Sequence, residues 1–346
     1  MAQRTRKSER KKSSGLAGFL LGILFFAVCA GGAVAWLVLS PYGPESETFV
    51  NIPSGSSVAA IGRKLQSAGV VRNRYAFDVL RWIQRGKLEA GEYRFDHPAP
   101  ATEVYVRIAR GDVFTETLTV PEGANIFDIA ARVEQEGLGT REQFLAAAAS
   151  QTALVADLDP DAKSLEGYLF PDTYKFSPTI TTQQMVATMV HRFRKEAAQL
   201  GLRGNVHDVV TIASLVERET AVDSERPLIA SVFENRLAKD MPLRTDPSVI
   251  YGLELTGQWR GTIYESDLTR DTAYNTYLHA GLPPGPVANP GLASLRAAMD
   301  PAKTDYLYFV AAGTDAQGHS LFAATLDEHN RNVANYRREQ KKAGER

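Results

Sequence analysis

The feature that most constrains this chain is a run without any charged residue, GLAGFLLGILFFAVCAGGAVAWLVLS, at residues 15–40. About twenty apolar residues in an α-helix, rising roughly 1.5 Å per residue, span the hydrocarbon core of a bilayer. The run is therefore long enough to form a transmembrane helix. It is also longer than the roughly 7–15 apolar residues of a cleaved signal peptide. The alternatives are a signal peptide cleaved at the Ala-Val-Ala of residues 33–35 and a lipid anchor at Cys29.

Charge on the two sides of this run predicts its orientation. Residues 1–14 hold six basic residues and one acidic residue, a net charge of +5, whereas the whole chain of 346 residues carries −1. Basic residues beside a transmembrane helix stay in the cytoplasm. We therefore expect a single-pass protein of the inner (plasma) membrane, with residues 41–346 on the periplasmic or extracellular side. A net charge of −6 after residue 14 excludes the strongly basic surface that is typical of nucleic-acid-binding domains.

Two stretches after the apolar run repeat at an offset of 68 residues: VNIPSGSSVAAIGRKLQSAGVVRN at 50–73 and LTVPEGANIFDIAARVEQEGLGTR at 118–141. Each predicts a short strand, a Pro-x-Gly turn and an amphipathic helix ended by Gly. The alternation in LEAGEYRF predicts a further strand at 88–95. The first repeat together with this strand resembles the LysM-like modules that bind cell-wall glycan. A structural spacer is the alternative interpretation.

Beyond residue 150 the pattern predicts a larger mixed domain. Residues 241–295 have little apolar periodicity, and we expect them to form long ordered loops. Pro227 suits the first turn of a helix that Asp223 or Ser224 would cap. The expected helices are 181–200, 206–220, 227–237 and 327–342, and the expected strands are 306–310 and 321–323.

Carboxylates near polar aromatic loops are the best candidates for chemistry. The six His show no HExxH or similar spacing, the single Cys excludes a cysteine-rich zinc site, and neither GxSxG nor a phosphate-binding loop occurs. We therefore expect no metal and no cofactor. Glu217 and Glu219 follow the apolar stripe of the helix at 206–220, where partial burial raises the pKa of a carboxyl and suits it to act as a general acid. Periodicity does not choose between them, and two solvated helix-end residues are the alternative.

Four motifs carry a family resemblance: LEGYLFPDTY at 165–174, ASLVERET at 213–220, RTDPSVIYG at 244–252 and TAYNTYLHAGLPPGPVANPG at 272–291. They resemble the YceG-like family of endolytic murein transglycosylases, and the likeness extends from the apolar run to about residue 340. It implies cleavage of peptidoglycan between N-acetylmuramic acid and N-acetylglucosamine within nascent strands, without water, leaving 1,6-anhydro ends. Glu219 is similar to the sole catalytic acid of lytic transglycosylases, and Glu217 is the alternative acid.

The resemblance also indicates candidate substrate-binding residues. Tyr274 and Asn275 match the Ala-Tyr-Asn segment that lines the cleft of lysozyme-like transglycosylases. For Glu166, Asn235, Arg236 and Asp246 the alternative roles are a loop cap, a helix-to-loop hydrogen bond and an Asp-Pro turn. The remaining candidates are Glu166, Asn235, Arg236, Asp246 and Tyr277, with Tyr168, Tyr174 and Tyr251 as further rings that could stack on sugars.

The expected fold class is α+β: a single N-terminal transmembrane helix, small LysM-like α/β modules, and a mixed α+β lytic transglycosylase catalytic domain. Peptidoglycan glycan strands and the membrane are the expected partners, with peptidoglycan synthases as a further hypothesis. A non-catalytic peptidoglycan-binding or scaffold protein and a hydrolytic muramidase are the alternative functions. The expected divisions are a cytoplasmic basic tail at 1–14, the transmembrane helix at 15–40, a LysM-like module at 46–115, a second small repeat-like unit at 116–155 and the catalytic domain at 156–346.

Overall fold

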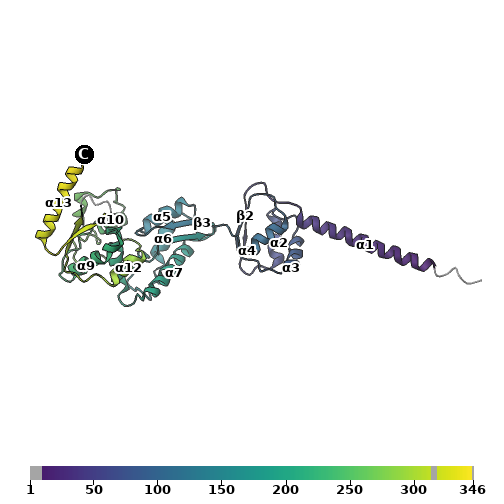
Figure 1. Ribbon diagram of the computed structural model, residues 1–346, viewed down its shortest axis with the longest axis horizontal. Coiled ribbons are helices and arrows are strands. Elements are labelled where there is room, and N and C mark those ends of the chain that lie inside the picture. Colours follow the sequence, from purple (N-terminus) through teal and green to yellow (C-terminus); the bar gives the residue numbers. More distant parts are fainter. Residues whose placement is uncertain (1–9, 313–317, 345–346) are drawn as a thin grey trace, which may run out of the picture. The chain divides into compact units, whose positions relative to one another are not determined.

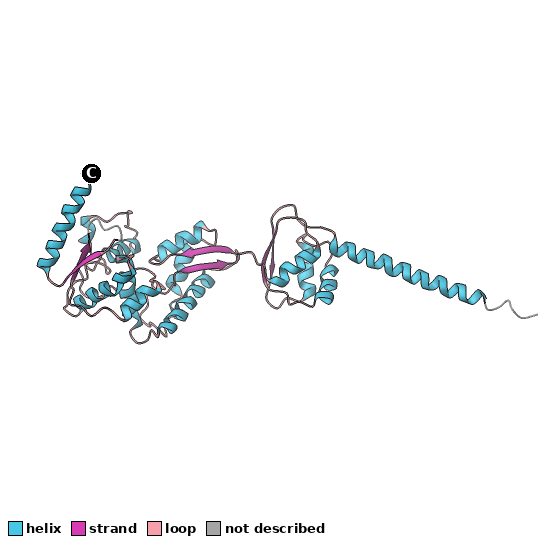
Figure 2. Cartoon of the chain, in the orientation of Figure 1, coloured by secondary structure: helices cyan, strands magenta, loops and turns pink. Residues whose placement is uncertain are grey.

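The computed structural model describes residues 10–312 and 318–344 (Figure 1). The chain divides into two compact units between Thr115 and Glu116, and each unit has its own hydrophobic core. Among the described residues the strands form three antiparallel two-stranded sheets, and helices make up most of the remaining structure (Figure 2). The fold is therefore a mixed α+β arrangement, as the sequence predicts.

The uncharged run lies in a single long helix, α1 (Arg10–Leu39). Its segment Gly18–Leu39 is long and apolar enough to cross a membrane. Most of its large apolar side chains are exposed, which suits a helix surrounded by lipid rather than by water. Only its end joins the first unit, where Val38 is buried in the core and the Arg72 guanidinium lies 4.5 Å from the ring centre of Trp36. This helix is consistent with a single-pass anchor.

The two sequence repeats fold into matching elements. In the first unit β1 (Thr48–Ile52) leads through a Pro-x-Gly turn into α2 (Val58–Ser67). In the second unit β3 (Glu116–Val120) leads through an equivalent turn into α5 (Ile126–Gln135). Both pairs bury aliphatic side chains at equivalent positions, and each such side chain contributes about 1.5–3 kcal/mol relative to exposure. These positions are Val50, Ile52, Ile61 and Leu65 in the first copy, and Leu118, Val120, Ile129 and Val133 in the second.

The repeat continues beyond the two stretches that the constant offset detects. In both units a second helix, a strand antiparallel to the first strand, and a third helix follow. The strand registers are the same, since the first residue of each unit's first strand faces a Phe at the end of its partner strand. These elements are α3 (Tyr75–Gln84), β2 (Gly91–Phe95) and α4 (Ala101–Arg110) in the first unit, and α6 (Arg141–Ser150), β4 (Asp172–Phe176) and α7 (Thr182–Leu200) in the second.

The second copy differs by a longer connection before its last strand. Residues 151–171 contain a short 3-10 turn, η1 (Thr152–Leu154), and then the loop that carries Glu166. Side chains of this loop, including Leu165 and Leu169, are buried in the same core as the second repeat and the helices that follow. The second repeat and the rest of the second unit therefore share one core.

The rest of the second unit is centred on α8 (Val206–Glu219), in which every residue from 210 to 216 is buried. This helix packs against α9 (Arg226–Leu237), α10 (Asp246–Leu255) and α12 (Leu292–Met299). The chain ends with a two-stranded sheet and α13, which packs against both of its strands. These last elements are β5 (Tyr308–Ala311), β6 (Ser320–Ala323) and α13 (Leu326–Gly344).

Two local expectations for this part are wrong. Residues 241–295 are not only loops, because they contain α10, a short helix α11 (Glu265–Leu268) and the start of α12. Buried residues lie on several sides of α10, so its sequence lacks a one-sided apolar periodicity. Neither Asp223 nor Ser224 caps α9: residues Asp223–Glu225 form a 3-10 turn, and the Asp223 carboxylate accepts a hydrogen bond from Arg226 at 3.0 Å.

Candidate active site

The last residue of α8, Glu219, lines a cleft of about 460 Å³. The cleft is built from three parts of the second unit: the ends of α8 and α9, the segment 243–246 together with Tyr277, and the elements β5 and α13. It contains aromatic faces beside charged and hydroxyl groups, a mixture that suits the apolar faces and polar edges of sugar rings. The cleft is therefore a candidate carbohydrate site.

The Glu219 carboxyl is the most perturbed acid in this cleft. Its burial raises its pKa to about 7, and the negative charge of Asp246 acts in the same direction. The Thr245 hydroxyl and the positive charges of Arg236 and Arg218 partly offset these effects. The C-terminal end of a helix also carries partial negative charge, which opposes ionisation of a carboxyl there. Glu219 is thus close to half protonated at neutral pH.

Glu217 has a different environment. Its carboxylate accepts a hydrogen bond from Arg226 at 2.8 Å and another from the Gly291 backbone N–H at 2.9 Å. Both members of the Glu217–Arg226 ion pair are almost fully buried, with 5% and 6% of their side chains exposed. Removing either member of such a buried pair leaves the other without its buried partner, which is costly. The geometry ties Glu217 to α9 and to the segment before α12.

Three of the candidate binding residues line the same cleft as Glu219: Arg236, Asp246 and Tyr277. The Tyr277 hydroxyl donates to the Asp246 carboxylate at 2.7 Å, which raises the pKa of the tyrosine in addition to its burial. The Arg236 guanidinium donates to the backbone carbonyls of Leu307 and Leu243, at 2.7 Å each. Arg236 thereby joins β5 to the segment that carries Asp246.

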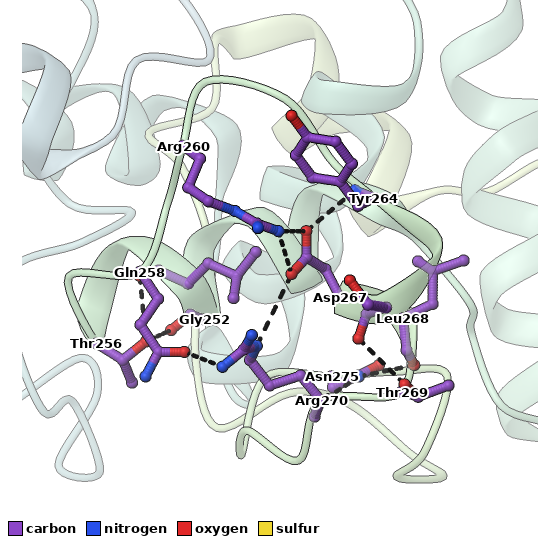
Figure 3. Close-up of polar contacts among 12 residues, drawn as sticks. Gly252, Thr256, Gln258, Arg260, Tyr264, Asp267, Leu268, Thr269, Arg270 and Asn275 are labelled. Atoms are coloured by element: carbon purple, nitrogen blue, oxygen red, sulfur yellow. Dashed lines mark hydrogen bonds and ion pairs between the residues drawn. The ribbon is translucent and has the colours of Figure 1, made fainter.

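Asn275 does not line the cleft. It is fully buried, and its amide donates to the carbonyls of Leu268 and Arg270 while its side-chain oxygen accepts from the Tyr277 N–H at 2.9 Å. Figure 3 shows Asn275 with Leu268 and Arg270 beside Asp267, a buried carboxylate that accepts hydrogen bonds from Arg260 and from the Tyr264 N–H. Asn275 therefore fixes the loop from which Tyr277 projects.

The other three candidates also hold the structure together rather than line this cleft. Glu166 is buried, accepts hydrogen bonds at 2.9 Å from the Ile126 N–H and from the Asn289 amide, and has its pKa raised to about 8 by burial. Asn235 donates to the carbonyls of Thr304 and Tyr306, at 2.9 Å each. The third is Tyr274, whose ring packs edge-on against Tyr251 at 4.9 Å between ring centres.

The expectation that Tyr168, Tyr174 and Tyr251 stack on sugars is wrong. All three are buried in the core of the second unit, with 0%, 7% and 2% of their surface exposed. The Tyr168 hydroxyl donates to Asp159 and the Tyr174 hydroxyl to the carbonyl of Phe170, at 2.5 Å each. Buried aromatic rings with satisfied hydroxyls are core residues.

Several cleft residues carry no signal in the sequence. Tyr308 and His329 lie in elements that the sequence predicts, but nothing in their local pattern places them opposite Glu219. Their rings stack at 5.1 Å between centres, and burial together with the charge of Arg236 lowers the pKa of His329. Arg244 lines the cleft with an exposed side chain and has a left-handed backbone, with φ of 50°. Such a conformation in a residue other than glycine is typical of functional sites.

Comparison with known proteins places this chain. The model of the YceG-like family matches residues 50–335, most of the chain. The chain belongs to the YceG-like family. A relative from Bacillus subtilis (strain 168), named endolytic murein transglycosylase, is 35% identical over 331 residues, covering 88% of this YceG-like chain and 90% of the relative. The predicted family resemblance is therefore confirmed.

Two further matches agree with this assignment. A Streptococcus pneumoniae protein (serotype 2, strain D39), also named endolytic murein transglycosylase, is 32% identical over 365 residues that cover 93% of this YceG-like chain. The match spans 66% of that longer relative. The crystal structure of a yceG-like protein from Listeria monocytogenes aligns with a TM-score of 0.54 and 32% identity, covering 83% of this chain and 99% of the other.

Proposed function

We propose that this YceG-like protein is a membrane-anchored, endolytic peptidoglycan lytic transglycosylase. It cuts the bond between N-acetylmuramic acid and N-acetylglucosamine within nascent glycan strands. The names of its relatives support peptidoglycan as the substrate. The observation that carries the mechanism is Glu219, a carboxyl in a polar aromatic cleft with its pKa raised to about 7. A group with such a pKa both donates and accepts a proton at neutral pH.

Glu219 serves as acid and then as base in one cycle. The protonated carboxyl gives its proton to the glycosidic oxygen as the bond from that oxygen to C1 of the muramic acid breaks. The C6 hydroxyl of the same sugar then bonds to C1, and its proton passes to the Glu219 carboxylate. The products are a free sugar hydroxyl and a 1,6-anhydro end, no water is consumed, and Glu219 is again protonated. The substrate's N-acetyl group can assist at C1, so no second carboxylate nucleophile is needed.

The other site residues divide into two groups. Tyr277, Asp246 and Arg236 touch or face the substrate, which their place in the cleft beside Glu219 supports. Glu166, Asn235, Tyr274 and Asn275 act as positioning residues, which their hydrogen bonds or ring contacts within the protein support, together with the burial of Glu166 and Asn275. This assignment changes the role that the sequence indicates for the second group, from substrate contact to support of the cleft.

The N-terminal part supplies location. Residues 1–14 form a cytoplasmic tail and 15–40 the anchor, which the length and exposure of α1 support. The module at 46–115 acts as a LysM-like glycan-binding unit. Residues 116–155 form the second repeat-like unit, which precedes the catalytic domain at 156–346. All three lie on the outer side of the membrane. Peptidoglycan synthases are the proposed partners because the anchor holds the enzyme where new strands are made.

Product analysis tests this proposal. The full chain in detergent is incubated with isolated sacculi, and released fragments are identified by mass spectrometry. Fragments with 1,6-anhydro-muramic acid ends are the expected result. Reducing muramic acid ends alone would indicate a hydrolytic muramidase, and binding without any release would indicate a scaffold protein.

A further inference from the structure

We propose that the glycan-binding groove continues from Glu219 across the β3–α5 turn onto the exposed face of α5, and we call the surface of Glu122, Arg218, Arg132 and Gln135 the repeat groove. The second repeat then binds sugars of the same strand on one side of the bond that is cut. This inference rests on the proposed function and extends its substrate site to a surface formed mainly by the second repeat, about ninety residues before Glu219 in the sequence.

The first observation is a chain of connected hollows. Besides the cleft described above, Glu219 lines a second hollow of about 370 Å³ that extends along Arg218 and Glu122. A third hollow of about 430 Å³ shares Glu122, Arg218 and Gly123 with the second and reaches Arg132 and Gln135 on α5. Neighbouring hollows therefore share lining residues, and Glu219 lines the first two of the three. An enzyme that cuts inside a strand needs such space on both sides of its acid.

The second observation is how the second repeat is fixed to the end of α8. A Cβ atom added at Gly123 would lie 3.4 Å from Cγ of Glu217 and 3.5 Å from Cδ of Arg218. The Arg218 guanidinium donates to the Gly123 carbonyl at 3.1 Å, and the Gly123 N–H donates to the Asn289 carbonyl at 3.0 Å. At the equivalent Gly55 of the first repeat, no described atom lies within 4 Å of such a Cβ. The turn of the second repeat is therefore packed against the end of α8.

The third observation is the chemistry of the exposed face of α5. Within the described residues, neither the Arg132 guanidinium nor the Gln135 amide has a side-chain hydrogen bond or ion-pair partner, and both residues are exposed. In the first repeat the position of Arg132 is taken by Lys64, whose ammonium donates to the Asn51 carbonyl at 3.0 Å. An amide suits sugar hydroxyl and acetamido groups, and a guanidinium suits the carboxylates of the peptides on the strand. The repeat groove therefore offers unused donors where a strand leaving Glu219 would pass.

Strand binding by the full chain tests this inference. A Glu219→Gln background prevents cleavage, and the affinity for uncrosslinked, peptide-bearing glycan strands is measured in detergent. The double variant Arg132→Ala, Gln135→Ala is expected to weaken binding by about 3- to 30-fold, the loss of one or two hydrogen bonds to charged or polar groups. The matched control is Lys195→Ala, Gln199→Ala on the exposed face of α7, which lines none of these hollows and should leave the affinity unchanged.

The outcomes separate this inference from the proposed function. Weaker binding by the groove variant but not by the control supports the repeat groove, even if the unsubstituted chain releases no anhydro product and the proposed function fails. Equal affinities for groove variant and control, or no strand binding at all, overturn the repeat groove. Thermal unfolding of both variants at the same temperature as the parent shows that the exposed substitutions leave the fold intact.

Discussion

Glu217 and Glu219 are two residues apart on α8, so their side chains leave the helix about 200° apart. One therefore points toward Arg226 and Gly291, and the other toward the cleft with Asp246 and Tyr277. A buried ion pair holds the first against Arg226, while burial raises the pKa of the second to about 7. The two carboxyls are thus suited to different tasks: Glu217 to structure and Glu219 to proton transfer.

The raised pKa of Glu219 predicts the pH dependence of cleavage. The reaction begins with a protonated carboxyl, so kcat/KM should be flat below a pH of about 7 and fall about tenfold per unit above it. The measurement is the initial rate of anhydro-muropeptide release between pH 5 and about 9. A profile that rises steadily through neutral pH would contradict the role of Glu219 as acid.

Glu166 predicts a pH dependence of stability. Its pKa is about 8 in the folded protein against an ordinary value of 4.5, so between these values the folded state holds a proton that the unfolded state lacks. The free energy of unfolding should therefore fall as pH rises through this window, by about 1.4 kcal/mol per unit from this group. Denaturant unfolding of the wild type and of Glu166→Gln at several pH values checks this. A slope unchanged in Glu166→Gln would refute the assignment.

At the scale of residues, the sequence predicts Glu219 as the candidate acid and three of the residues that line its cleft. Which other residues line the cleft depends on tertiary structure. Asp246, Arg236 and Tyr277 lie in motifs or elements near those of Glu219 and reach the cleft with it. Tyr308 and His329 are far along the chain and join the cleft only because β5 packs against α9 and α13 packs against β5. No local pattern encodes such long-range contacts, and none distinguishes a buried Tyr from one that faces a cleft.

At the scale of elements, the sequence reveals only the first half of each repeat. The constant offset of 68 holds through the strand, turn and first helix. The later strands match as EYRF at 92–95 and TYKF at 173–176, but at an offset of 81, because the second copy has the longer connection that carries Glu166. A comparison at fixed offset cannot follow a repeat across an insertion, whereas the shared strand register makes the relation plain.

Gly167, in the longer connection of the second repeat, is expected to tolerate no larger residue. Gly167 has φ of 85°, and an added Cβ would lie 2.5 Å from Cγ of Pro286 and 2.8 Å from Cγ1 of Val210. Gly167→Ala should therefore lower the free energy of unfolding by about 3–5 kcal/mol, through backbone strain and overpacking together. Gly201→Ala is the matched control, because Gly201 has φ of 71° but no described atom within 4 Å of its added Cβ. It should cost only about 1–2 kcal/mol.

Urea unfolding of the two glycine variants beside the wild type provides this comparison. Similar losses in both would mean that the contact of the Glu166 loop with α8 is not tight. A larger loss in Gly167→Ala, accompanied by weaker cleavage, would show that this loop supports the site from behind.

At the scale of the whole molecule, the net charge of −1 is the sum of a tail of +5 and a remainder of −6 on the two sides of the uncharged run at 15–40. In the proposed topology the tail sets the orientation, and the remainder shares a compartment with the proposed peptidoglycan substrate. The net charge of −1 by itself gives no sign that the chain has a basic and an acidic part. The uncharged run at 15–40 marks where the basic tail ends and the acidic remainder begins.

This topology predicts which positions a membrane-impermeant maleimide reaches in intact spheroplasts. In a Cys29→Ser background, Ser54→Cys in the exposed turn after β1 should be labelled, and Ser8→Cys should be labelled only after the membrane is permeabilised. The readout is a mass shift of the purified chain. Labelling of Ser8→Cys in intact spheroplasts would contradict the proposed orientation.

The most direct test of the central claim compares Glu219→Gln with Glu217→Gln in the release of anhydro-muropeptides from sacculi. Glu219→Gln should lose at least about 10²–10⁴-fold in rate while unfolding at a temperature close to that of the wild type. Glu217→Gln should keep the chemistry but lose about 3 kcal/mol of stability, because the buried Arg226 loses its buried ion-pair partner. Wild-type release by Glu219→Gln would contradict the account, as would loss of release in a Glu217→Gln protein that is still folded.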